Sequence, residues 1–81
     1  MNLSVKLFAV AKQAAGRDVV ELQLAAGATV ADVRRALVAA VPALAPAAKH
    51  LMFAVGAEYA ADDRALRPTD EIACIPPVSG G

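Results

Sequence analysis

The C-terminus is the part of this sequence whose residue types suggest chemistry. The chain ends in Gly80 and Gly81, and Pro76 and Pro77 stand a few residues earlier. Proline lacks a backbone N–H and fixes φ, so a strand should end there and the rest should project as an extended arm. Glycine has no Cβ, which lets the end of such an arm thread a narrow channel. The carboxylate of Gly81 is a poor electrophile, so we expect another enzyme to activate it, with ATP as the usual reagent.

Other reactive side chains have simpler explanations. Cys74, the single cysteine, lies in an apolar segment and is expected to be a small buried hydrophobe. His50 has no second histidine or nearby cysteine at ligand spacing, so no metal site is predicted. Asp62 and Asp63 stand beside Arg64 in a turn-like stretch and are expected to be solvated. With no phosphate-binding glycine loop and no base paired to a nucleophile, the chain is predicted to be a carrier that binds no cofactor, not a catalyst.

Length and charge narrow the possible functions. The chain has 81 residues, which is enough for one small domain and too little for two hydrophobic cores. Eight basic residues balance eight acidic ones, so no basic stripe predicts nucleic-acid binding. The sequence contains no long uncharged apolar run and no signal-like start, so we expect no membrane span and a cytoplasmic protein.

Alternation of apolar and polar residues predicts the strands that must position the arm. Residues 1–7 and 18–25 alternate with period two, and together they form a natural antiparallel pair. Residues 51–55 share the same pattern and lead through a Gly-Ala turn into the short segment 58–60. A proline-containing turn then precedes a last strand at 72–75.

One main helix is predicted from Thr29 to about Val41. Thr29 and Asp32 form a start typical of a capping box, and Pro42 ends the run. Apolar residues recur on one helical face at spacings of three and four, namely Val30, Val33, Leu37 and Val41. We expect residues 11–16 to be a short turn of helix or a loop, and residues 42–48 to be a connecting loop with at most one helical turn.

The element order predicts an α+β domain of the β-grasp, ubiquitin-like type. In this arrangement one main helix crosses between two antiparallel hairpins and lies on one face of a mixed sheet. We expect residues 1–75 to form the domain and residues 76–81 to form the flexible arm, which would reach roughly 20 Å when extended.

Two apolar residues near the base of the arm suggest a docking patch. Phe8 falls on the opposite parity to the buried residues of the first strand, so it should point away from the core. Ile75 shares the outer face if Ile72 and Cys74 point inward. Single exposed apolar side chains are common, but a pair beside the arm favours a surface that binds partners.

The whole chain resembles the molybdopterin synthase small subunit family of sulfur carriers. The resemblance rests on residues 7–9 followed by Gly16, on residues 54–59, and above all on residues 70–73 leading into the C-terminal segment. A terminal Gly-Gly also ends other sulfur carriers and protein modifiers, but the Pro-Pro-Val-Ser before it resembles the molybdopterin branch closely. The partner-binding arm would then consist of Pro76, Pro77, Val78, Ser79 and Gly80, followed by the reactive Gly81.

This resemblance implies a cycle with several partners. An E1-like adenylyltransferase would use ATP to activate Gly81, and a persulfide donor would convert it to a thiocarboxylate. The arm would then enter the large subunit of molybdopterin synthase, where the sulfur attacks a pyranopterin precursor to build the dithiolene. In that family the assembly is a heterotetramer around a large-subunit dimer.

Three alternatives share parts of this pattern. A sulfur carrier for another pathway, such as thiamine biosynthesis, would have the same fold, arm and activation chemistry. A ubiquitin-like modifier would instead join Gly81 to lysine side chains. A non-covalent interaction module would use only the surface.

Overall fold

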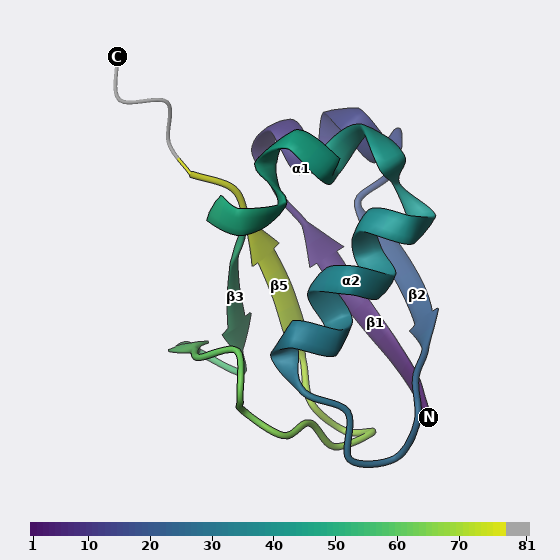
Figure 1. Ribbon diagram of the computed structural model, residues 1–81, viewed down its shortest axis with the longest axis vertical. Coiled ribbons are helices and arrows are strands. Elements are labelled where there is room, and N and C mark those ends of the chain that lie inside the picture. Colours follow the sequence, from purple (N-terminus) through teal and green to yellow (C-terminus); the bar gives the residue numbers. More distant parts are fainter. Residues whose placement is uncertain (78–81) are drawn as a thin grey trace.

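The computed structural model describes residues 1–77 and shows an α+β fold in which one main helix covers one face of a mixed five-stranded sheet (Figure 1). The strand order across the sheet is β2-β1-β5-β3-β4. This arrangement confirms the predicted fold class. In chain order the elements are β1 (Asn2–Leu7), α1 (Ala9–Ala15), β2 (Val19–Gln23), α2 (Val30–Ala40), the 3₁₀ helix η1 (Pro42–His50), β3 (Met52–Val55), β4 (Glu58–Ala60) and β5 (Ile72–Ile75).

The last strand, β5, lies in the middle of the sheet. It pairs in parallel with β1, where Leu7 is opposite Cys74, and antiparallel with β3, where Met52 is opposite Ile75. β2 and β4 form the two outer edges. The chain therefore leaves the sheet from its centre, at the end where α1 and the end of η1 also lie (Figure 1).

Helix α2 begins as the sequence predicts. The Asp32 carboxylate accepts hydrogen bonds from the Thr29 backbone N–H at 2.9 Å and from the Thr29 hydroxyl at 3.2 Å. The bond from the Thr29 N–H contributes most to holding the pKa of Asp32 below its usual value. Three side chains of the predicted apolar face are buried against the sheet, namely Val30, Val33 and Leu37.

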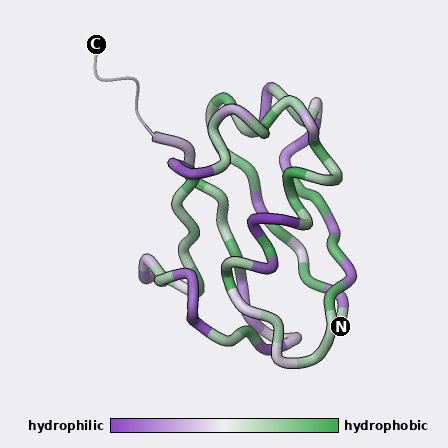
Figure 2. Tube along the Cα trace, viewed as in Figure 1, coloured by the Kyte–Doolittle hydropathy of each residue, from purple (hydrophilic) through white to green (hydrophobic). Residues whose placement is uncertain are grey.

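The core is built from apolar side chains of both layers. The largest fully buried ones are Phe53, Leu3, Leu7, Leu37 and Leu51. Figure 2 shows hydrophobic stretches along the central strands, whereas hydrophilic and hydrophobic stretches alternate along the loop between β4 and β5. Within residues 1–77 no polar or charged side chain is buried, so hydrophobic burial is the main contribution to stability.

Two helical segments are longer than the sequence predicts. η1 has nine residues in place of a loop with at most one helical turn, and its Leu44 is buried in the core. α1 begins at Ala9, two residues before the predicted start, and ends at Ala15, followed by Gly16 in the left-handed conformation with φ 72°. In both cases contacts with the domain stabilise a segment whose own residue pattern has no clear helical period.

Arg34 on helix α2 connects this helix to η1, to β3 and to the loop after β4. Its guanidinium donates to the backbone carbonyls of Ala48 and Leu51, each at 2.6 Å, and to the Asp62 carboxylate at 2.7 Å. The guanidinium also lies 5.1 Å from the centre of the Phe53 ring. Among residues 1–77, the neighbouring Arg35 forms only an ion pair with Asp32, and its side chain is 70% exposed, compared with 19% for Arg34.

These two adjacent arginines allow a matched test. Arg34→Met should lower the free energy of unfolding by about 1.5 to 3 kcal/mol, because several hydrogen bonds to a charged group are lost. Arg35→Met should change it by less than about 0.5 kcal/mol, because an exposed ion pair contributes little. Urea unfolding followed by circular dichroism gives both values, and equal losses for the two variants would contradict the assigned role of Arg34.

Candidate functional site

The base of the arm is anchored by the sheet. Pro76 directly follows β5 and is buried, whereas Pro77 is exposed. Ile75 pairs with Met52 at the start of β3, so the chain is held up to this point by hydrogen bonds and packing. The remaining predicted arm residues lie outside the described part of the chain, namely Val78, Ser79, Gly80 and Gly81.

An apolar patch lies beside this base on the sheet face that α2 does not cover. We call it the outer patch and define it as Phe8, Met52 and Ile75. Phe8 is 41% exposed and Met52 is 49% exposed, while Ile75 is half-buried between them in the strand order. The structure thus places Phe8 and Ile75 on one face, as their parity indicates. Met52 was not singled out from the sequence, although its parity, opposite to that of Leu51 and Phe53, carries the same signal.

The turn after β1 directs Phe8 outward. Phe8 itself is extended, with φ −126° and ψ 156°, and Ala9 then adopts a positive φ of 52°. A positive φ is unusual for a residue with a Cβ, so the surrounding structure must maintain it. The Lys6 ammonium lies 5.4 Å from the centre of the Phe8 ring, which gives the patch a cationic border.

Smaller side chains extend this face across the sheet. Lys6 pairs with Ala73, Ala73 with Ala54, and Ala54 with Tyr59 on the edge strand β4. Ala54 and Ala73 leave this region flat, and Tyr59 is 63% exposed at its far side. A flat apolar face of this kind is typical of a protein-binding surface.

Cys74 points away from this face into the core. Its side chain is fully buried, and burial raises the pKa of its thiol to about 11. A thiol in this state holds its proton at neutral pH and is a weak nucleophile. The structure therefore gives Cys74 a packing role, and the chemistry predicted for this chain does not involve it.

The remaining candidates form no reactive cluster. Asp62 is exposed to solvent, as expected, and also forms an ion pair with Arg34. Asp63 and His50 are exposed. Residues 1–77 contain no group of three or more side chains able to hold a metal ion. In the same part of the chain, no helix has the length and apolar character needed to cross a bilayer.

Comparisons with known proteins find relatives over nearly the whole chain. A model of the ThiS family matches residues 5–81. The molybdopterin synthase sulfur carrier subunit of Chlamydomonas reinhardtii is 39% identical and the alignment covers all of both chains. The corresponding subunit of Arabidopsis thaliana is 32% identical over all of this chain and 84% of its own.

Solved structures are similar over nearly the whole fold. SAMP1 from Haloferax volcanii matches with a TM-score of 0.87 and 36% identity, covering all of both chains. A putative molybdopterin converting factor subunit 1 from Pyrococcus furiosus matches with a TM-score of 0.82 and 27% identity, covering 96% of this chain and 99% of that one.

The buried position of Cys74 predicts its reactivity. In the native protein at about pH 8, Cys74 should resist alkylation by iodoacetamide, and it should react readily in denaturing urea. Folding raises the pKa of the Cys74 thiol, so burial of the protonated thiol contributes fully to the free energy of unfolding below pH 9.0. This contribution is lost as the pH rises towards about 11. Mass spectrometry of time points measures the reaction, and rapid alkylation of the folded protein would contradict the packing role.

Proposed function

The chain belongs to the ThiS family and is a sulfur carrier in molybdenum cofactor biosynthesis, and we propose that it carries the sulfur on the C-terminal carboxylate of Gly81. The single observation that carries this proposal is the position of the residue at which the arm begins. The arm starts from buried Pro76 at the end of the central strand, directly beside the exposed outer patch. A partner that covers the patch would be positioned to receive the arm.

The relatives support a carrier role, because two of them are sulfur carrier subunits of molybdopterin synthase. The thiol of Cys74 is buried and holds its proton at neutral pH. Catalysis would therefore belong to the partners, and this chain would act as the sulfur-donating small subunit of a molybdopterin synthase. The chain itself would need no bound cofactor.

The chemistry of the carboxylate defines the order of steps. An E1-like adenylyltransferase would join Gly81 to AMP from ATP and release pyrophosphate. The terminal sulfur of a persulfide donor would then displace AMP and form an acyl disulfide. A thiol would attack the donor's sulfur in this acyl disulfide, which forms a new disulfide with the donor and releases the thiocarboxylate. Free thiols are available in the cytoplasm, which is where we place the cycle.

The outer patch would be used with each partner in turn. The adenylyltransferase and the synthase large subunit must both reach the same six-residue arm, so both need a surface at its base. Burying Phe8 and Met52 would exclude water from the contact and position the arm, while the flat alanine region would allow close approach. In the large subunit the thiocarboxylate sulfur would attack the pyranopterin precursor, and two such transfers would complete the dithiolene. The family assembly, a heterotetramer, provides one carrier for each large subunit.

A ubiquitin-like modifier is the second candidate function. Structures of small archaeal modifier protein 1 match this chain with TM-scores of 0.83 for Haloferax volcanii and 0.78 for Methanosarcina acetivorans. The activation of Gly81 would be the same, but a lysine amine would displace AMP and form an isopeptide bond. Lysine-linked conjugates in cells would support this use, and sulfur transfer with a purified large subunit would support the carrier function.

Changing the length of the arm should remove activity without unfolding the domain. Deletion of Gly81, or addition of one alanine after it, moves the carboxylate away from the partner's reacting groups. Molybdopterin formation by the reconstituted synthase should fall to background, while the free energy of unfolding changes by less than about 0.5 kcal/mol. Activity of the extended protein without trimming would contradict the proposal.

A charge in the outer patch should weaken docking. Phe8→Asp should reduce affinity for the large subunit by roughly tenfold or more, because a central aromatic contact is lost and a carboxylate is desolvated. The control is Ala39→Asp, at an exposed position of α2 on the other side of the sheet. Isothermal titration calorimetry measures both, and unchanged affinity for Phe8→Asp would show that the patch is not the docking surface.

A further inference from the structure

We propose that the open edge of β2 is a second protein-binding site, where an extended segment of a partner adds as a further strand. This goes beyond the sulfur-carrier function, because the site uses neither the arm nor the outer patch. The partner segment is expected to alternate, with apolar residues facing α2 and a basic residue placed opposite Glu21.

The hydrogen-bond pattern identifies the free groups of this edge. The Leu24 N–H donates to Met1 and the Leu7 N–H donates to Asp18, which fixes the alternation of bonded pairs between β1 and β2. By that alternation the backbone of Val20 forms hydrogen bonds with Val5, and the backbone of Leu22 forms them with Leu3. The backbone groups of the intervening residues then face away from the sheet, and these residues are Val19, Glu21 and Gln23. Three successive outward N–H and C=O pairs are what strand addition requires.

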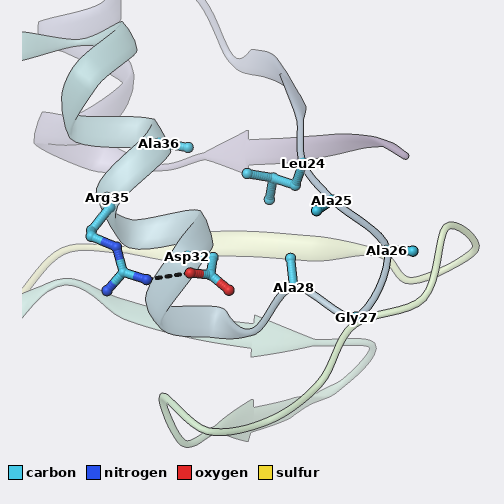
Figure 3. Close-up of a pocket in the computed structure, with 8 residues that line it drawn as sticks. All are labelled: Leu24, Ala25, Ala26, Gly27, Ala28, Asp32, Arg35 and Ala36. Carbon is cyan, nitrogen blue, oxygen red and sulfur yellow. Dashed lines mark hydrogen bonds and ion pairs between the residues drawn. The ribbon is translucent and has the colours of Figure 1, made fainter.

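A hollow on the helix side adjoins the end of this edge. It lies between the chain leaving β2 and the first half of α2, and Leu24 and Ala36 point towards one another across it (Figure 3). Its other lining residues include Ala28, Asp32 and Arg35. Since Asp32 and Arg35 neutralise each other as an ion pair, the hollow is suited to an uncharged apolar side chain. In an added strand, a residue opposite Leu24 would point to this side.

The charge of the edge favours a basic partner segment over a second copy of this chain. Glu21 is exposed at the middle of β2, and its only hydrogen bond within the described residues comes from the Ser4 hydroxyl at 3.3 Å. Antiparallel pairing of two copies, centred on β2, would place Glu21 directly opposite Glu21, and like charges in that position repel. A lysine or arginine opposite Glu21 would instead form a cross-strand ion pair.

The opposite sheet edge provides a contrast within the same molecule. β4 has only three residues, Glu58 to Ala60, and is too short to present the same ladder. Glu58 is exposed there, as Glu21 is on β2. This makes Glu58 a matched control for a charge reversal on an edge strand.

The test uses a synthetic peptide, acetyl-Leu-Thr-Val-Lys-Val-Thr-amide, designed to run antiparallel to β2 with its leucine at the hollow and its lysine opposite Glu21. It is titrated into the full-length ¹⁵N-labelled protein at up to millimolar concentration. We expect saturable shifts of the Val19, Glu21 and Gln23 amides. Glu21→Lys should weaken binding about threefold to tenfold, because one cross-strand attraction becomes a repulsion. Glu58→Lys should leave binding unchanged.

A swapped peptide with glutamate in place of lysine makes the test independent of folding defects. It should bind Glu21→Lys better than it binds the unmodified protein. The proposal is overturned if the amides of β2 do not shift, if Glu58→Lys has the same effect as Glu21→Lys, or if the swapped peptide shows no reversal. Thiocarboxylate formation by Glu21→Lys should stay normal, which separates this site from the carrier function.

Discussion

The central position of β5 is the constraint on which the rest of the structure depends. This strand is bonded to β1 on one side and to β3 on the other, and its Ile72 and Cys74 are buried in the core. A strand paired on both edges frays less than a chain end at a sheet edge. The chain therefore leaves the sheet at a fixed point, Pro76, and the proposed chemistry belongs to the residues that follow it.

Because the arm begins at a fixed point beside the outer patch, a partner that binds the patch would be positioned to receive the arm. The parallel register between β1 and β5 brings the end of β1 beside the end of β5, so Phe8 and Ile75 follow paired residues although 66 residues of sequence lie between them. A partner that recognises this place would locate the arm at the same time, which lowers the entropic cost of capturing a free chain end. In the proposed cycle, recognition by the body and reaction at the carboxylate would be separate tasks, joined by a short spacer.

Local pattern was enough to predict most of the fold. The strands follow from two-residue alternation, and α2 follows from Thr29, Asp32 and the apolar spacing, because these signals act within a few residues. The nine residues of η1 lack such a period, and they are ordered by burial of Leu44 and by the bonds from Arg34 to distant carbonyls. The positive φ of Ala9 could not be predicted from the sequence either, because tertiary contacts maintain a conformation that alanine alone does not favour. The outward direction of Phe8 and Ile75 could be predicted from parity, and the parity of Met52 gives the same signal, but its place beside Ile75 depends on the register between β3 and β5.

The most direct test of the central claim is to locate the sulfur. The protein is incubated with the adenylyltransferase, ATP and a persulfide donor, treated with an alkylating reagent, and digested for mass spectrometry. Alkylation distinguishes a thioacid from methionine oxidation, which gives nearly the same mass change. If the account is correct, the alkylated sulfur is found on the C-terminal peptide that ends in Gly81, and Cys74 is unmodified. Sulfur on Cys74, or a C-terminal peptide without it in a preparation that supports molybdopterin formation, would contradict the account.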